Sequence, residues 1–167
     1  MLSNVKEELN RFAKYVISQS RANLTRGKKN SSKELYNSLK SDIKVSTNSF
    51  ELSFLMEEYG VFQDKGVSGV KKKYNTKYSY TNKMPPPSKM DKWIVKKGIA
   101  PRDKNGKFIS RKSLQFMIAR SIFNNGIKPS LFFTKPFEKA FKNIDKDLIK
   151  AFKLDVEALM TNSINNK

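Results

Sequence analysis

The chain has 167 residues, 38% of them hydrophobic, a length that suits a single folded domain. Its 34 Lys and Arg against 15 Asp and Glu give a formal net charge of +19, which predicts attraction to polyanions, above all nucleic acid. The absence of Cys and His excludes disulfides and thiolate metal sites and leaves few groups for catalysis. We therefore expect a protein that is not an enzyme and that has no metal or cofactor.

The first segment has the period of a helix. Apolar residues recur at intervals of three and four from Val5 to Ile17, which predicts a helix over about residues 4–24. Asn4 and Glu7 are placed to form a capping box at its start. We expect neither a signal peptide nor a membrane span, since the early residues include acids and no apolar run is long enough.

The next segment alternates apolar and polar residues in two runs, separated by the polar residues 46–49. This pattern predicts an antiparallel β-hairpin with one face half buried. The apolar positions are Leu39, Ile43 and Val45 in the first run and Phe50, Leu52, Phe54 and Met56 in the second.

Three glycines follow the hairpin at positions 60, 66 and 69. Their spacing predicts a backbone that turns tightly around Tyr59 and Phe62. The stretch is not a phosphate-binding loop, because it lacks the Gly-Lys-Ser or Gly-Lys-Thr ending that such a loop requires.

Most of the excess positive charge is local. Residues 65–112 contain 15 Lys and Arg but only two acids, so they contribute +13 to the net charge. Interleaved Lys and Tyr side chains suit backbone attraction combined with base stacking on single-stranded nucleic acid. An extended, solvated loop whose tyrosines pack on a neighbouring subunit is the other interpretation. The candidate DNA-facing or interface residues are Lys71, Lys72, Lys73, Tyr74, Lys77, Tyr78 and Lys83.

Two small elements are expected inside this basic region. Asp91 and Ser88 can cap a short helix that contains Trp93, and Gly98 can terminate it. The dipeptide Asn105-Gly106 predicts the turn of a small two-stranded flap.

Two helices are expected in the last third of the chain. One begins at about Ser110 and carries so wide an apolar surface that we expect burial on most sides. Gly126 is placed to take the left-handed position after it, and Pro129 prevents the helix from resuming. A final helix over about residues 136–160 should bury Phe137, Ala140, Phe141, Ile144, Leu148, Phe152, Val156 and Leu159.

Together these elements predict the α+β class. We expect an N-terminal helix, an antiparallel β-hairpin or small sheet, and two C-terminal helices packed on it. The chain would form a single domain over residues 1–167, with residues 67–112 as a basic insertion and residues 161–167 as a polar tail.

Three features occur in a fixed order: "YGVFQDKGVSG" after the hairpin, a central "MDKWIVKKGI", and "LQFMIARSIFNNGIKPSLFF" before the final helix. In this order they resemble the family of tailed-bacteriophage neck proteins, also called head-to-tail joining or tail-completion proteins. The resemblance covers roughly residues 35–160. The matching positions are Tyr59, Gly60, Asp64 and Gly66 in the first feature, and Ile118, Ala119, Gly126, Ile127, Lys128, Pro129 and Phe132 in the third.

The resemblance implies a structural virion protein of the phage neck, assembled in the host cytoplasm. Its copies would close into a ring of about six or twelve between the portal or connector and the tail. The ring would complete head-to-tail joining and surround the DNA path, where basic side chains reduce phosphate repulsion without reading sequence. The segment "PSLFF" would be a docking corner, or simply part of the core.

Two alternatives come from the residues themselves. The chain could be a stand-alone, sequence-nonspecific nucleic-acid-binding protein that uses the Lys- and Tyr-rich segment 65–112. It could also be a carboxylate-based metal nuclease, in which clustered acids hold Mg²⁺. The acids concerned are Glu51, Glu57, Glu58 and Asp64.

Overall fold

The computed structural model describes residues 2–30, 32–46 and 49–165, with side chains as far as Thr161. It has an N-terminal helix, a two-stranded antiparallel sheet and C-terminal helices, which confirms the predicted α+β class. The chain divides into two compact units. Unit 1 comprises Met1–Arg26, Leu35–Glu57 and Phe132–Lys167, and unit 2 comprises Gly27–Glu34 and Glu58–Leu131. Unit 2 thus contains the predicted basic insertion and also extends beyond it on both sides.

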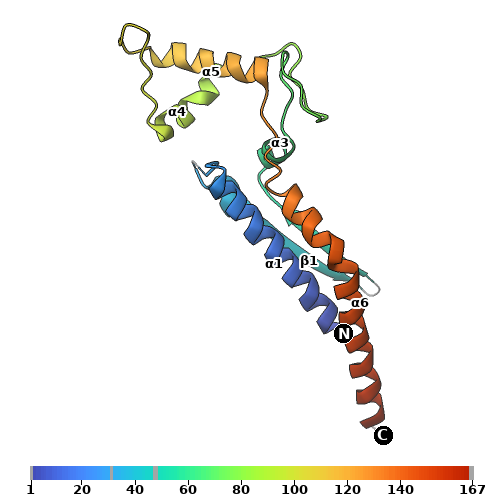
Figure 1. The fold of residues 1–167 in the computed structure, drawn as a ribbon. Helices are drawn as coiled ribbons and strands as arrows, with labels where there is room; N and C mark the ends of the chain where they lie inside the picture. The colour runs from blue at the N-terminus through green and yellow to red at the C-terminus, as the bar shows by residue number, and fades with distance from the viewer. Residues whose placement is uncertain (1, 31, 47–48, 166–167) are drawn as a thin grey trace. The chain divides into compact units, whose positions relative to one another are not determined.

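Unit 1 is built on two antiparallel helices, α1 (Ser3–Arg26) and α6 (Thr134–Asn165), which lie side by side (Figure 1). Near the end of α1, the Asn23 side chain donates a hydrogen bond to the Phe132 carbonyl just before α6. Near the start of α1, Asn4 bonds to Asp155, late in α6. These two contacts fix the direction and the register of the helix pair.

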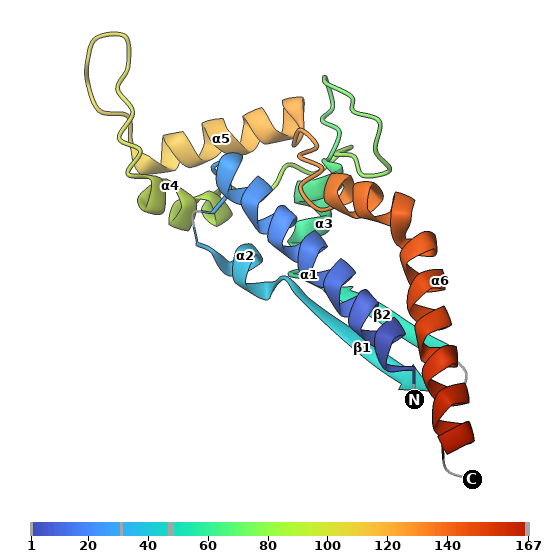
Figure 2. The ribbon, with the colours of Figure 1, turned by 60° about the horizontal axis from the view of Figure 1, so that its bottom comes forward.

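The predicted hairpin is confirmed. Strand β1 (Lys40–Ser46) follows the short helix α2 (Glu34–Ser38) and pairs with β2 (Ser49–Leu55), and both strands lie beside α1 (Figure 2). In the register, Ile43 faces Leu52 and Val45 faces Phe50, as the alternation requires. Residues 47 and 48, between the strands, lie outside the described residues.

The core of unit 1 consists of two apolar clusters. One contains Phe12, Val16 and Ile144, and Phe54 and Phe137 pack against it. The ring centroids of Phe12 and Phe137 lie 5.8 Å apart in an edge arrangement, a geometry that stabilises aromatic pairs by about 0.5–1.5 kcal/mol beyond burial. The second cluster consists of Leu24, Leu35, Leu39 and Phe132.

Asp155 caps the first turn of α1 from the opposite helix. Asp155 is 3% exposed, and its carboxylate accepts hydrogen bonds from the backbone N–H groups of Asn4 and Val5 at 3.0 Å. The Asn4 side chain donates to the same carboxylate at 2.8 Å, and Ser3 Oγ donates at 3.3 Å. The predicted Asn4–Glu7 capping box is therefore wrong: α1 begins at Ser3, and an acid distant in the sequence satisfies its free N–H groups.

Helix α6 differs from the prediction in length and burial. It begins at Thr134 and continues to Asn165, so most of the predicted polar tail is helical. Phe141, Phe152 and Leu159 are each about half exposed, whereas burial was predicted for all three. The physical reason is that α1 covers only the face with Ile144 and Ala151, and that α1 begins beside Asp155, short of the end of α6 (Figure 1).

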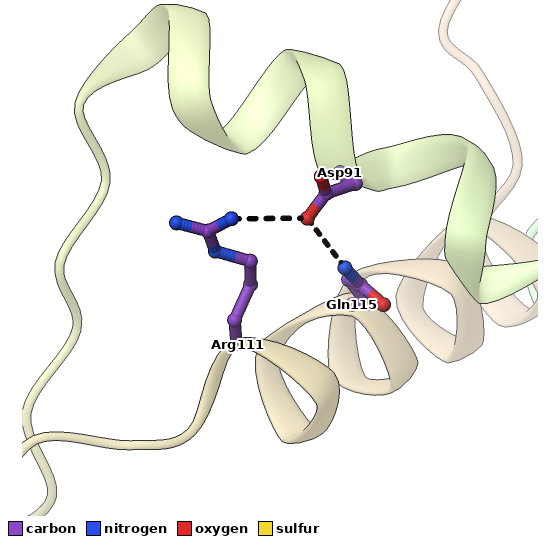
Figure 3. Close-up of polar contacts among 3 residues, drawn as sticks. All are labelled: Asp91, Arg111 and Gln115. Carbon is purple, nitrogen blue, oxygen red and sulfur yellow. Dashed lines mark hydrogen bonds and ion pairs between the residues drawn. The ribbon is translucent and has the colours of Figure 1, made fainter.

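Unit 2 contains α3 (Tyr59–Lys65), the 3₁₀ turn η1 (Pro87–Met90), α4 (Asp91–Lys97) and α5 (Arg111–Asn125). Gly98 ends α4 in the left-handed conformation, as predicted. An antiparallel bridge between Arg102 and Phe108 forms the predicted flap. Among the described residues, no side chain caps α4, contrary to the prediction. Asp91, its first residue, accepts a 2.7 Å hydrogen bond from Gln115 of α5 and lies 3.7 Å from Arg111 (Figure 3).

Helix α5 is less buried than the sequence suggested. Ser110 caps its start by accepting a hydrogen bond from the Ser113 N–H. Along the helix only Leu114 and Ala119 are buried. Phe116 and Met117 are about half exposed, so the prediction of burial on most sides is wrong. The apolar surface of α5 is wider than η1 and α4, which pack on it, can cover.

Candidate functional site

Parts of two of the three features that carry the resemblance lie side by side in unit 2. Residues 63–72 and 123–131 run antiparallel and exchange main-chain hydrogen bonds at several points. The Val67 and Ile127 backbones bond in both directions, at 2.9 and 2.7 Å. The Asp64 carbonyl accepts from the Leu131 N–H at 3.0 Å. We call these two segments the paired corner.

Glycine is required on both sides of the paired corner. A Cβ on Gly66 would lie 2.6 Å from the Pro129 ring, and the residue has φ +77°. Gly126 has φ +71° with ψ −165°, so it is not in the left-handed helical conformation predicted for it. It is instead extended, with a positive φ that is nearly restricted to glycine, and this directs the chain into pairing with Val67.

The first glycine cluster also differs from its prediction. Residues 59–65 form helix α3 and not a tight loop, with Gly60 buried inside the helix. Gly66 and Gly69 allow close backbone approach to the second segment, which is a different use of the same residue type. The spacing of the glycines indicated that small residues were needed here, but it did not indicate that they pack against residues 124–129.

The family-motif positions are distributed over both units. Gly60, Asp64 and Gly66 are buried, and Tyr59 is half exposed on α3. On α5, Ala119 is buried and Ile118 half buried. Gly126 and Pro129 belong to the paired corner, whereas Phe132 lies in the core of unit 1 at 2% exposure. The Phe of "PSLFF" that matches the motif is thus a core residue.

Ser68 holds the Lys- and Tyr-rich loop in place, and the sequence analysis did not single it out. Its hydroxyl donates to the Tyr74 carbonyl at 3.0 Å and accepts from the Tyr74 N–H at 2.9 Å. Its backbone bonds to Tyr78 and Tyr80, each at 2.8 Å. The only sign of this role in the sequence was a small polar residue that lies between Gly66 and Gly69.

A cavity of about 580 Å³ opens where this loop meets α3, within the size range of ligand pockets, about 300–1,000 Å³. The Phe62 and Tyr78 rings meet edge to face in its wall, with centroids 4.8 Å apart. Lys77 Nζ lies 5.1 Å from the centre of the Tyr78 ring. Burial raises the pKa of the Tyr80 hydroxyl. The lining consists of Tyr59, Phe62, Gln63, Val67, Lys77, Tyr78, Ser79, Tyr80 and Ile127.

Two of the candidate DNA-facing or interface residues belong to the wall of this cavity. Lys77 and Tyr78 line it, whereas Lys71 and Lys72 are bonded through their backbones to Asn124 at the end of α5. Tyr74 is half buried and is not part of the lining. The five candidate lysines have exposed side chains: Lys71, Lys72, Lys73, Lys77 and Lys83.

Charge is divided unevenly between the units. Unit 2 holds 20 of the 34 Lys and Arg but only 5 of the 15 Asp and Glu, so 15 of the 19 net positive charges belong to it. Two of its acids are paired with cations, Glu34 with Lys96 and Asp91 with Arg111. Most of its basic side chains are therefore available to an anionic partner.

The described residues show weaker evidence for any other binding site. A shallow hollow of about 810 Å³ on unit 1 is lined by Lys14, Arg21 and Arg26, but Arg21 is engaged in bonds to the carbonyls of Tyr36 and Leu39. Within the described ranges, no group of three or more Asp and Glu is placed to hold a metal ion. The helices in the described part of the chain include none with the length and apolar character to span a membrane.

No protein-family model, curated protein or solved structure matches the chain.

Proposed function

We propose that the chain is a structural component of a tailed-bacteriophage neck. In this role, copies form a closed ring between the portal or connector and the tail, and the ring surrounds the DNA path. The paired corner supports the resemblance, because two of the motif segments that carry it, about 60 residues apart, are bonded into one feature. The positive charge of unit 2 suits a surface that faces a dense line of phosphates.

One observation favours an assembly component over an isolated binding protein: α6 has an exposed apolar stripe. Phe141, Phe152 and Leu159 follow one another at intervals of 11 and 7, which places them on one face of the helix. Ile149 and Met160 widen this face, and all five side chains are about half exposed or more. An exposed apolar surface that continues along a helix is typical of a protein–protein contact.

A second candidate function is sequence-nonspecific nucleic-acid binding by unit 2 without a ring. Its charge and its interleaved lysines and tyrosines favour this function. Nucleic-acid binding without a ring gives the exposed stripe of α6 no role, so this function is the second candidate.

Native mass spectrometry of the purified protein, alone and with its connector, tests the first proposal. We expect a closed ring of about six or twelve copies, because cyclic closure prevents open-ended growth of head-to-tail contacts. A protein that stays monomeric even with its virion neighbours would contradict the neck assignment. The second candidate predicts such a monomer.

A further inference from the structure

We propose that the aromatic cavity of unit 2 binds a single unpaired base of a nucleic-acid strand, while the neighbouring lysines bind the backbone phosphates. The inference rests on the second candidate function, nucleic-acid binding, and does not depend on ring assembly.

The lining of the cavity has the composition of a base-stacking site. Four aromatic side chains from α3 and the Lys- and Tyr-rich loop surround it: Tyr59, Phe62, Tyr78 and Tyr80. Aromatic faces attract every base, so stacking needs no particular sequence. Gln63 and Ser79 add neutral polar groups to the lining, which can meet the polar edge of a base.

The charge around the cavity selects an anionic ligand. Among the described residues that line the cavity, Lys77 is the one charged residue, and none is Asp or Glu. Lys71, Lys72 and Lys73 belong to the same loop, and their side chains are exposed. A strand with one base in the cavity can therefore place the adjacent phosphates near cations, and the occupant is a nucleotide chain and not a neutral apolar peptide.

The loop is also braced in the shape that forms the cavity. Ser68 fixes the backbones of Tyr74, Tyr78 and Tyr80, and Thr76 Oγ1 donates to the Gly66 carbonyl at 3.1 Å. A site that is already formed loses less conformational entropy when a ligand binds. The base has to be unpaired, because a base inside a duplex is stacked between its neighbours and cannot enter a pocket.

The test compares two strands with equal phosphate charge. Fluorescence anisotropy measures binding of an oligothymidylate of about twelve nucleotides and of an abasic strand of the same length. We expect the oligothymidylate to bind about tenfold more tightly, because only this strand can stack a base in the cavity. Phe62→Ala should remove this preference, and Phe62→Trp should keep it. Phe108→Ala, which changes an exposed aromatic residue of the flap in the same unit, is the control and should leave the preference unchanged.

The outcomes separate the two ideas. Equal affinity of the wild-type protein for both strands would overturn the base site but leave charge-driven binding intact. An equal loss of the preference for oligothymidylate in Phe62→Ala and Phe108→Ala would have the same meaning. If neither strand binds, the second candidate function fails together with the base site. Should Phe62→Ala not fold, NMR of the wild-type protein decides: the Phe62 and Tyr78 ring signals should shift with oligothymidylate and not with the abasic strand. Shifts with both strands, or with neither, would contradict the proposal.

Discussion

Gly69 and Gly126 lie so close that neither residue has room for a side chain. A Cβ on Gly126 would be 2.5 Å from the backbone nitrogen of Gly69, and a Cβ on Gly69 would be 2.5 Å from that of Gly126. Such distances are well below van der Waals contact, and the atoms that would be met belong to the backbone, which cannot move aside easily. Glycine at both positions therefore allows the two segments of the paired corner to approach each other closely.

Alanine substitutions separate close approach from backbone conformation. Gly98 also has a positive φ, +61°, but has open space around it, so Gly98→Ala should cost only about 1 kcal/mol of unfolding free energy. Gly126→Ala combines a positive φ with the clash and should cost about 3 kcal/mol or more. Gly69→Ala introduces a clash without a positive φ, so its loss of unfolding free energy should fall between these two values. Urea unfolding curves measure all three, and equal values for Gly98→Ala and Gly126→Ala would contradict the close approach.

Asp155 should make the stability of unit 1 depend on pH. Burial acts to raise the pKa of the Asp155 carboxyl, but the hydrogen bonds from the Asn4 and Val5 backbones and from the Asn4 and Ser3 side chains lower it overall. A folded-state pKa below the unfolded value, about 3.9, means that the stabilisation is complete above that value and is lost as the pH falls through the folded-state pKa.

The variant Asp155→Asn should therefore have a lower Tm than the wild type at pH 7, with a difference that shrinks in acid. Asp145→Asn, which removes an exposed carboxylate from the same helix, is the control and should change Tm little at any pH. Thermal melts between about pH 2 and pH 7 show both trends. A Tm difference that stays constant down to the lowest pH would mean that the charge of Asp155 does not cap α1.

The exposed stripe of α6 should be the contact between copies. Phe152 and Leu154 are 52% and 54% exposed on the same helix, but they point about 200° apart around its axis. Phe152→Ser should weaken self-association about 10- to 30-fold, as expected for a central aromatic contact, and Leu154→Ser should not. Analytical ultracentrifugation against concentration measures this. Equal effects of the two substitutions would show that the stripe is not the interface.

The lysines of the basic loop should determine the salt dependence of DNA binding. Changing Lys71, Lys72 and Lys73 to Gln should lower the slope of log K against log salt by about 0.9 for each lost phosphate contact on duplex DNA. The control changes Lys142, Lys146 and Lys150 of α6 to Gln, which removes the same charge from unit 1. If both triple variants lower the slope equally, binding responds to the net charge of the chain and not to this loop.

The two partners of Asp91 should contribute unequally to the stability of unit 2. The Gln115 side chain donates a 2.7 Å hydrogen bond to the Asp91 carboxylate, so Gln115→Met should cost about 1 kcal/mol (Figure 3). The Arg111 guanidinium lies 3.7 Å away and is largely exposed, so Arg111→Gln should cost at most about 0.5 kcal/mol. Denaturant unfolding measures both, and a larger loss for Arg111→Gln would show that the ion pair dominates.

Two local features of this chain were predicted correctly from sequence patterns. The alternation from Leu39 to Met56 predicted the hairpin, because apolar residues at every second position place one face of the strands against the core. The breakers at Gly126 and Pro129 located the end of α5, since backbone conformation there depends on single residues. The sequence did not reveal that Tyr78 and Tyr80 of the Lys- and Tyr-rich loop line a cavity.

Features that depend on residues distant in the sequence could not be predicted. Nothing near Asn4 indicates that Asp155 will cap its helix, since more than 150 residues separate them. Helical periodicity identifies an apolar stripe on α6, but it does not state whether a neighbour covers that stripe, and Phe152 was wrongly assigned to the core. In the same way, the glycine pattern did not pair Gly69 with Gly126.

The division of the chain also constrains the order in which the protein can fold as it is synthesised. Unit 1 is discontinuous, and its core needs Phe132 and Ile144, which are made after every residue of unit 2. Helix α1 and the hairpin therefore leave the ribosome long before their packing partner exists, and their apolar faces stay uncovered during that interval. The paired corner, by contrast, is complete once Leu131 has emerged. A nascent chain stalled once this residue has left the ribosome should thus contain a folded unit 2, while its N-terminal segment is still accessible to chaperones.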